Sequence, residues 1–390
     1  MCEQLDEQPE QFRVLNGLRS FYNICGDLDK AHQLAQSILG LATKLDDSGF
    51  LLEAHAGLAS NEFFAGNLQA SLKHAQQGIA FYDKDTHAGH AALYGLDPGV
   101  FCYARAGQTI WPLGYSDQAL NYEKQAVELA QTLNHPYSLV FAIHNLTQVL
   151  LYRREGEAAL ASAKQGKALA LQHGFSFLSA WSFHLSAWAF ALLGDVGNAR
   201  KDIEQALAAE RPEAPTANSY LGVFLAESYR LLGDVKNGLS SLAIPCKEHS
   251  YKVKRLYLQA EFHLLGNNSK KSIDQAEVLF KEALETSRQQ GVKAYELCTA
   301  ISLSKLLMRR KRNQEAYECL NNITRWFQEG FDTPELLEAN QLLEQLNILL
   351  EKDIENHNVA YYNTPINSDN KTKTFYSNIV TIHKNIGVRI

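Results

Sequence analysis

The stretch Ser186–Asp195 reads SAWAFALLGD, and Leu225–Asp234 reads LAESYRLLGD. Both stretches place a small residue at the second position, an aromatic residue at the fifth and glycine at the ninth. Three earlier segments share the frame, with glycine always ninth and a large fifth residue in most copies: Leu18–Asp27 (LRSFYNICGD), Leu58–Asn67 (LASNEFFAGN) and Ala106–Tyr115 (AGQTIWPLGY). A frame that recurs at a long period indicates a repeat protein.

Each part of the frame has a physical reason. A small residue in the middle of a helix lets another helix approach closely, and the large residue beside it fills the adjoining gap. The glycine ends the helix in a left-handed turn, which other residues adopt only under strain. A second helix follows, with its own small residue at Ala31, Ala70, Ala119, Ala199 or Gly238. The frame therefore predicts helix-turn-helix units that stack on one another.

Three weaker copies, around Thr147, Ala260 and Ser304, complete the series. The second frame position then falls at residues 19, 59, 107, 147, 187, 226, 260 and 304, with Arg19 as the exception to the small-residue rule. This pattern predicts an all-α, tetratricopeptide-like right-handed superhelix of about eight helix-turn-helix repeats plus a capping helix.

The predicted superhelix covers residues 1–352. Asp332 and Glu335 have the spacing of a capping box for the final helix, which should end near Glu351. Residues 353–390 are rich in asparagine and lose the helical period, so we expect a polar, loosely ordered tail.

The longest interval between repeats contains Phe81–Val100. Asp97 followed by Pro98 predicts a helix start, because the carboxylate can cap the helix and proline suits its first position. His87 and His90 have a spacing that a metal site could use. No third ligand is near, so we expect surface histidines in a loop and no metal site.

Composition excludes several classes of protein. The 390 residues carry a net charge of −6, which disfavours nucleic-acid binding. The six cysteines form no C-x-x-C motif, and the acidic, polar N-terminus does not resemble a signal peptide. Phe175–Gly194 has no charged residue over twenty positions, but its serines share one helical face. We therefore expect a buried helix, no membrane contact and a cytoplasmic location.

Two stretches resemble a known family. They contain D-P-G-V at Asp97–Val100, L-G-Y-x-D-Q-A-L at Leu113–Leu120 and W-F-x-E-G-F-D-T at Trp326–Thr333. These motifs resemble the C-terminal tetratricopeptide-repeat half of bacterial class III adenylate/guanylate cyclase–AAA (signal-transduction) ATPase proteins. The resemblance covers about residues 5–350 and implies a sensory module that controls the attached enzymes. Leu96 stands where that family often has a polar residue, so no ligand contact is carried over to it.

The sequence contains no pattern of catalytic residues and no cofactor motif, so we expect a chain that is not an enzyme. A binding site should lie on the concave face, which the first helix of each repeat builds. In tetratricopeptide arrays, the inward residues lie 3, 6, 10 and 13 positions before the turn. This register selects His144, Gln148, Trp181, His184, Trp188, Tyr220, Glu227, Arg230 and Tyr257. Alternatively, Trp181 and Trp188 pack between helices.

Three hypotheses for the function follow. The first is a non-catalytic binding module for a protein or peptide partner, or for a small signal molecule. The second is a fragment of a split adenylate cyclase/ATPase that acts on catalytic partners in trans. The third is a free-standing adaptor or a secreted effector. The residues alone do not identify the ligand, the oligomeric state or the role of the tail.

Overall fold

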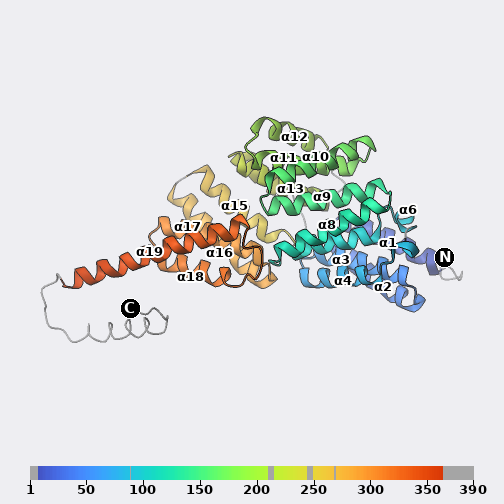
Figure 1. Ribbon diagram of the computed structural model, residues 1–390, viewed down its shortest axis with the longest axis horizontal. Helices are drawn as coiled ribbons and strands as arrows, with labels where there is room; N and C mark the ends of the chain where they lie inside the picture. Colours follow the sequence, from blue (N-terminus) through green and yellow to red (C-terminus); the bar gives the residue numbers. More distant parts are fainter. Residues whose placement is uncertain (1–7, 88, 210–214, 244–248, 268, 363–390) are drawn as a thin grey trace. The chain divides into compact units, whose positions relative to one another are not determined.

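The computed structural model describes residues 8–87, 89–209, 215–243, 249–267 and 269–362, all in helices or in short segments between helices (Figure 1). Sixteen of the nineteen helices in this part of the chain form eight consecutive antiparallel pairs. The first helices are α1 (Gln8–Ile24), α3 (Ser48–Phe64), α7 (Pro98–Ile110), α9 (Pro136–Tyr152), α11 (Ser176–Leu192), α13 (Pro215–Leu231), α15 (Lys252–Gly266) and α17 (Lys293–Arg309). The second helices are α2 (Leu28–Leu45), α4 (Leu68–Phe81), α8 (Ser116–Thr132), α10 (Gly156–Gln172), α12 (Val196–Ala208), α14 (Val235–Leu242), α16 (Lys270–Gln290) and α18 (Asn313–Thr324).

Three helices stand outside the pairs. The short helices α5 (Lys84–His87) and α6 (His90–Tyr94) occupy the long interval between the second and third pairs, and α19 (Pro334–Tyr362) follows the eighth. The chain divides into two compact units, Met1–Leu343 and Glu344–Ile390, and all eight pairs lie in the first. The predicted fold class, an all-α, tetratricopeptide-like superhelix of eight repeats and one further helix, is confirmed.

The predicted repeat frame matches the structure. All eight second positions are buried in the first helix of a pair, and the turn follows seven residues later. Five of the turn positions are glycines with φ between 71° and 105°. Arg154 and Lys311 take the same left-handed conformation in the fourth and eighth pairs, with φ of 54° and 59°. Asn267, in the seventh pair, is extended instead. The left-handed turn is therefore present in more of the pairs than a glycine at the turn position is.

One small position was predicted wrongly. In the second pair, the buried small residue of α4 is Ser71, whereas the predicted Ala70 is only half-buried. Ser71 lies five residues after the turn, as Ala31 and Ala119 do in their own pairs. Its hydroxyl donates to the carbonyl oxygen of Ala59 at 2.7 Å, so serine fits this close contact because its one polar group is bonded.

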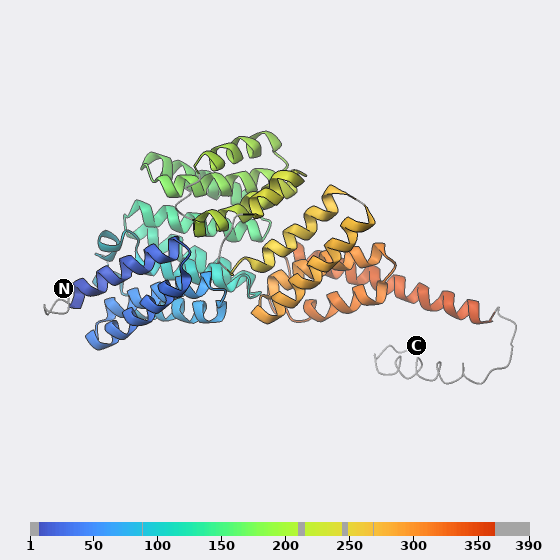
Figure 2. The ribbon, with the colours of Figure 1, turned by 180° about the vertical axis from the view of Figure 1, so that it is seen from behind.

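The superhelix is tightly wound, so that successive turns touch (Figures 1 and 2). Four contacts join successive turns. In each, the end of one pair's first helix meets the start of the first helix that lies five pairs further along the array; in one contact α19 takes the place of that later helix. The four contacts are Thr216 Oγ1 to Asn23 O (2.9 Å), His249 N to Phe64 O (2.9 Å), Ala294 N to Pro112 O (3.1 Å) and Arg154 Nε to Glu335 Oε1 (2.7 Å). One turn of the superhelix therefore takes about five pairs.

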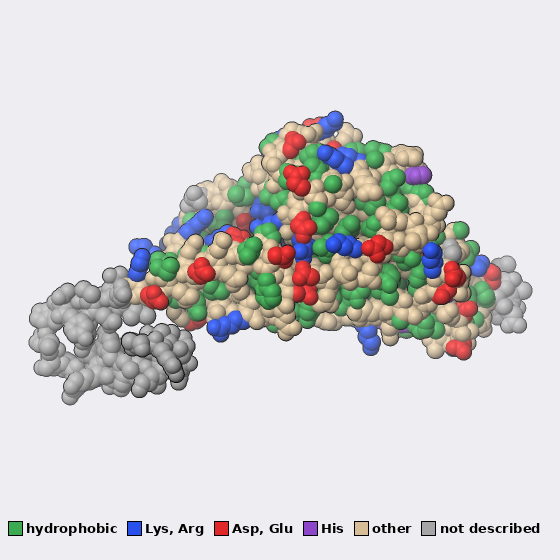
Figure 3. Space-filling view, in the orientation of Figure 1, with side chains coloured by type: hydrophobic (Ala, Val, Ile, Leu, Met, Phe, Trp, Pro, Cys, Tyr) green, Lys and Arg blue, Asp and Glu red, His purple; other side chains and the backbone are tan. Residues whose placement is uncertain are grey.

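This winding encloses the first helices. In α3, 13 of 17 residues are buried, and in α11, 12 of 17 are. The second helices bury one side only, as α8 does with four residues. Acidic and basic side chains are interspersed with small hydrophobic areas on the face shown in Figure 3. First helices inside the array, such as α3 and α11, are covered by their neighbours, whereas α1 at the start of the array buries only four residues.

Two of the three motifs that carried the family resemblance meet at one of these contacts. Leu113–Leu120 and Trp326–Thr333 are more than 200 residues apart, yet Glu329 Oε1 accepts hydrogen bonds from the backbone nitrogens of Asp117 (2.8 Å) and Gln118 (3.1 Å). These nitrogens belong to the first turn of α8 and have no partner within the helix. The carboxylate therefore caps α8 from the far end of the array.

Tight packing accompanies this cap. The ring of Trp326 lies against Gly114, and its centroid is 5.5 Å from that of Tyr115. Next to it, Asp117 Oδ2 accepts a hydrogen bond from Gly330 N at 3.0 Å. The motifs that carried the family resemblance are therefore architectural in this chain.

The segment between the second and third pairs differs from the prediction. Asp97 caps α7 as predicted, accepting from Val100 N at 2.9 Å. His87, predicted at the surface, is only 2% exposed and accepts at Nδ1 from Asp83 N (3.0 Å). His90 Nδ1 lies 2.9 Å from Glu53 Oε1. The surface-loop prediction is wrong because α5 and α6 pack this segment against α3. In the described part of the chain, no three His, Cys, Asp or Glu side chains are placed to hold a metal ion.

The last helix also differs in detail. It begins at Pro334, so Asp332 is not its cap; the Asp332 carboxylate instead lies 3.8 Å from the Arg153 guanidinium. The helix continues to Tyr362, beyond the predicted end near Glu351. Residues 363–390 of the predicted tail lie outside the described residues. Among the described helices, none combines the length and apolar character needed to cross a membrane.

Two glycine substitutions test the winding. Gly114 and Gly194 both occupy left-handed turns, but a Cβ at Gly114 would lie 2.6 Å from the Trp326 ring and 2.9 Å from Lys293 Cβ, whereas a Cβ at Gly194 meets nothing within 4 Å. We expect Gly194→Ala to cost about 1 kcal/mol of backbone strain. Gly114→Ala should cost about 2–4 kcal/mol, because overpacking adds to that strain. Urea unfolding of both variants measures this difference, and equal costs would contradict the contact.

Candidate functional site

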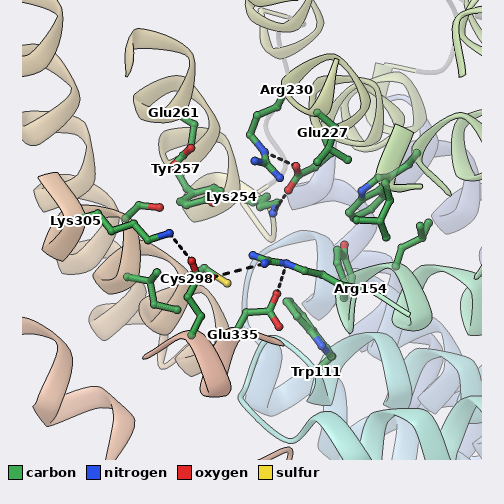
Figure 4. Close-up of a pocket in the computed structure, with 18 residues that line it drawn as sticks. Trp111, Arg154, Glu227, Arg230, Lys254, Tyr257, Glu261, Cys298, Lys305 and Glu335 are labelled. Carbon is green, nitrogen blue, oxygen red and sulfur yellow. Dashed lines mark hydrogen bonds and ion pairs between the residues drawn. The ribbon is translucent and has the colours of Figure 1, made fainter. Parts of the chain in front are cut away.

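A cavity of about 260 Å³ opens among the first helices of pairs four to eight, and we name it the inner cavity (Figure 4). Residues from α9, α11, α13, α15, α17 and the start of α19 line it, together with Trp111 after α7. Its charged side chains are four cations and four carboxylates: Arg154, Arg230, Lys254, Lys305, Glu227, Glu261, Glu335 and Glu338. The lining is therefore densely charged but carries no net charge.

Glu227 is the most deeply buried of these charges, with its side chain 4% exposed. Arg230 Nε lies 2.7 Å from one of its oxygens, and Lys254 forms an ion pair with the other. Burial alone would raise the pKa of Glu227, but the two cations outweigh it and lower the pKa to about 2. The Glu227 carboxylate therefore stays ionised over the physiological pH range.

Arg154 joins two turns of the superhelix at the edge of the cavity. Its Nε lies 2.7 Å from Glu335 Oε1, and its NH1 lies 3.7 Å from Glu338 Oε2. Lys305 forms an ion pair with Glu338 as well. Arg154 occupies the turn position where five other pairs have glycine, and these ion pairs offset the strain of its left-handed backbone.

Aromatic rings form the rest of the wall. Trp111 stacks on Tyr152 with 4.3 Å between ring centroids, and Trp188 meets Tyr152 edge-on at 5.5 Å. The Lys254 ammonium lies 5.0 Å from the centroid of the Tyr257 ring. Glu261 has no hydrogen-bond or ion-pair partner among the described residues. The cavity thus offers flat apolar surfaces beside charged groups, a combination that suits polar side chains with apolar stems.

Four of the nine predicted site residues line this cavity: Trp188, Glu227, Arg230 and Tyr257. Gln148 and Tyr220 do not reach it. Gln148 Oε1 accepts from Tyr220 OH (2.6 Å) and Gln108 Nε2 (3.0 Å), while its Nε2 donates to the hydroxyls of Tyr152 and Tyr251. This network bonds helices of four different pairs to one another in the interior.

The other three predicted residues are also packed inside. His144 Nε2 lies 2.8 Å from Ser182 Oγ, and His184 Nδ1 lies 2.8 Å from the carbonyl oxygen of Ala180. Trp181 is 3% exposed and packs edge-on against His144. Burial lowers the pKa of His144 to about 3 and that of His184 to about 4. A role for these five residues in binding stays a prediction, and the geometry does not bring them to the cavity.

Sequence reasoning missed most of the charged lining. The same register, applied fully to the seventh and eighth pairs, adds Lys254, Glu261, Cys298, Ile301 and Lys305, which line the cavity, and Leu264 and Met308, which do not. That signal was present in the sequence, because the turn positions of both pairs were already identified. The repeat register does not select Glu335 and Glu338, because these residues reach the cavity only through the contact between turns.

No protein-family model matches the sequence, and no curated protein does. Among solved structures, a Rap protein complexed with Competence and Sporulation Factor is similar. It is 12% identical, with 89% of this chain and 99% of that chain covered and a TM-score of 0.52. At this identity the similarity shows the fold alone, an all-helical array of the tetratricopeptide kind.

Two further structures have lower TM-scores. The Rap conjugation gene regulator of the plasmid pLS20, in complex with the Phr* peptide, is 11% identical and covers 87% of this chain and 97% of that one (TM-score 0.47). Yeast Tom70 is 14% identical, with 83% of this chain and 61% of that one covered (TM-score 0.41).

The buried histidines give a test of the packed interior. Their pKa values lie below the ordinary 6.5, so the native chain stays neutral at these rings while the unfolded chain binds protons. Stability should therefore fall as pH drops below about 6.5, by up to about 1.4 kcal/mol per pH unit for each ring. NMR titration should find His144 and His184 neutral at pH 5. Protonation midpoints near 6.5 would mean that both rings face solvent.

Proposed function

We propose that the chain is a non-catalytic binding module whose inner cavity receives side chains from a peptide segment of a partner protein. The observation that carries this proposal is the cavity's lining of balanced charges beside aromatic rings. At about 260 Å³ it suits one or two side chains of a longer segment better than a whole small molecule. The similar fold of a Rap protein, which was solved with a bound factor, supports a binding role.

The chemistry of the lining also supports a non-enzymatic role. Burial raises the pKa of the Cys298 thiol to about 12, so at neutral pH it is not a thiolate nucleophile. Glu227 and Glu335 are both held in ion pairs, and no histidine is among the residues that line the cavity. These groups can bind and orient a ligand, but they do not form an acid–base pair or an activated nucleophile.

The sequence resemblance suggests a context for this binding. In the cyclase–ATPase signalling proteins, the repeat half is expected to control the enzymes attached to it. We extend that to this chain as the finer proposal: partner binding regulates cyclase or ATPase subunits supplied in trans. A change in the rate of such an enzyme when the chain is added would support it. Binding without any effect on a catalytic partner would instead favour a free-standing adaptor or effector.

A matched pair of variants tests the inner cavity. Peptides are selected from a random displayed library against the whole chain. We expect them to bind the Glu261→Gln variant at least fivefold more weakly than wild type. Glu261 is the carboxylate of the cavity that forms no hydrogen bond or ion pair with another side chain of the described residues, so a ligand can pair with it. Isothermal titration calorimetry gives the affinities. Glu282→Gln, an exposed carboxylate on α16, is the control and should bind like wild type.

Stability should be nearly unchanged in both variants, because Glu261 makes no hydrogen bond or ion pair that the substitution removes. Equal binding by wild type and Glu261→Gln, for every selected peptide, would exclude the inner cavity as the binding site. A small molecule that competes with the selected peptides would instead indicate a small-ligand sensor.

A further inference from the structure

A second cavity, of about 490 Å³, lies between α1, α3 and the segment from α6 to the start of α7. We name it the N-terminal cavity; it shares no lining residue with the inner cavity. Its size lies in the ordinary range for ligand sites. Leu93 and Ile24 are more than half exposed at its rim, and Leu96 and Phe101 extend the apolar wall.

Arg19 places a positive charge in the wall of this cavity. It stands at the frame position where most repeats have a small residue, and it is only 8% exposed. Gly57 on α3 leaves the space for it, since a Cβ there would lie 2.9 Å from Arg19 Nε. The glycine on the facing helix therefore accommodates the large residue at this frame position.

This buried cation forms no ion pair within the described residues. Its guanidinium donates to Asn16 Oδ1 (2.9 Å), Asn61 Oδ1 (3.0 Å) and Ser20 Oγ (2.9 Å), all of them neutral. No carboxylate of the described residues lies within ion-pair distance of it. Burial lowers the pKa of Arg19 to about 10, so it remains charged at neutral pH. Buried charges are ordinarily paired, so an anionic group is expected in the cavity beside it.

The carboxylate that acts on Arg19 electrostatically, Glu53, is held by a histidine. Glu53, 6% exposed, lies 2.9 Å from His90 Nδ1 through its Oε1. At the rim, Arg13, whose side chain is 46% exposed, is ion-paired with Glu10 at 3.6 Å. Arg19 is therefore the cation of this cavity that no ion pair within the described residues neutralises, which favours a negatively charged ligand beside it.

A second buried group lacks a partner as well. Asn23 is 7% exposed and lines the cavity. Its Nδ2 donates to Ser60 Oγ at 3.3 Å, but its Oδ1 has no hydrogen-bond partner. An unsatisfied buried acceptor costs about 1–3 kcal/mol, and an N–H donor from a ligand would remove that cost. The lining of the cavity thus leaves the Arg19 cation without an ion pair and the Asn23 oxygen without an N–H donor.

We propose that the N-terminal cavity binds a peptide that carries a carboxylate. The carboxylate lies beside the Arg19 guanidinium, a main-chain N–H donates to Asn23 Oδ1, and apolar side chains cover Leu93 and Phe101. An inorganic anion would leave Asn23 and the apolar wall unused, so a peptide fits more of the lining. This site is separate from the inner cavity and does not depend on the function proposed for it.

Three pools of acetylated pentapeptides test the ligand class on the full chain. The first carries a central glutamate and an amidated end, the second a central glutamine and an amidated end, and the third a central glutamine and a free C-terminal carboxylate. By calorimetry, the glutamate pool or the free-carboxylate pool should bind at least tenfold more tightly than the neutral pool, and the comparison identifies the source of the carboxylate. Equal binding of all three pools, or no binding, would overturn the proposal.

Four variants then locate the site. Arg19→Gln should weaken the carboxylate-bearing pool at least tenfold, whereas Arg200→Gln, which removes an exposed arginine on α12, should not. Because Arg19 also bonds within the protein, Asn23→Leu provides a second test and should weaken binding at least fivefold while the helical circular dichroism is retained. Unchanged binding by folded Asn23→Leu would overturn the proposal. So would a loss of binding in Glu261→Gln, because that loss would place the peptide in the inner cavity.

Discussion

The contact between successive turns of the superhelix is the constraint on which the rest of the structure depends. Each helix pair is too small to bury its own apolar faces, and stacking in the array buries only part of them. Because five pairs complete one turn, the end of each early first helix meets an element five positions later. The turn positions Gly26, Gly66 and Gly114 all face such elements, so close packing and left-handed turns are required at the same places.

The same winding explains where binding is possible. The concave side of an open array would present a continuous groove, but here Gln148, Tyr220 and their partners fill it with a hydrogen-bonded network. Space remains where charged or long side chains interrupt the packing. The inner cavity lies where Arg154 reaches across to α19, and the N-terminal cavity lies where Arg19 replaces a small residue. Both cavities therefore occur at departures from the repeat frame.

Sequence reasoning could predict the fold because the frame is local. The second frame positions, seven of which hold small residues, and the cap at Asp97 depend on contacts within a pair or between adjacent pairs. The site was harder to predict, because a short repeat does not specify how many pairs make a turn. His144 and Trp181 were selected as inward residues, but adjacent pairs bury them: His144 Nε2 lies 2.8 Å from Ser182 Oγ, and the Trp181 ring packs against Tyr220. Glu335 could be placed in the inner cavity only once the five-pair winding was known.

The ion pair between Arg154 and Glu335 offers the most direct measurement of this winding, because the two residues are 181 positions apart and meet only if successive turns touch. A double-mutant cycle with Arg154→Met and Glu335→Gln gives the coupling energy from four urea-unfolding curves. The account predicts a coupling of about 1 kcal/mol or more, because the Glu335 side chain is largely buried. If the effects of the two substitutions on the free energy of unfolding add within about 0.3 kcal/mol, the result would contradict the contact between turns, and with it the closed interior.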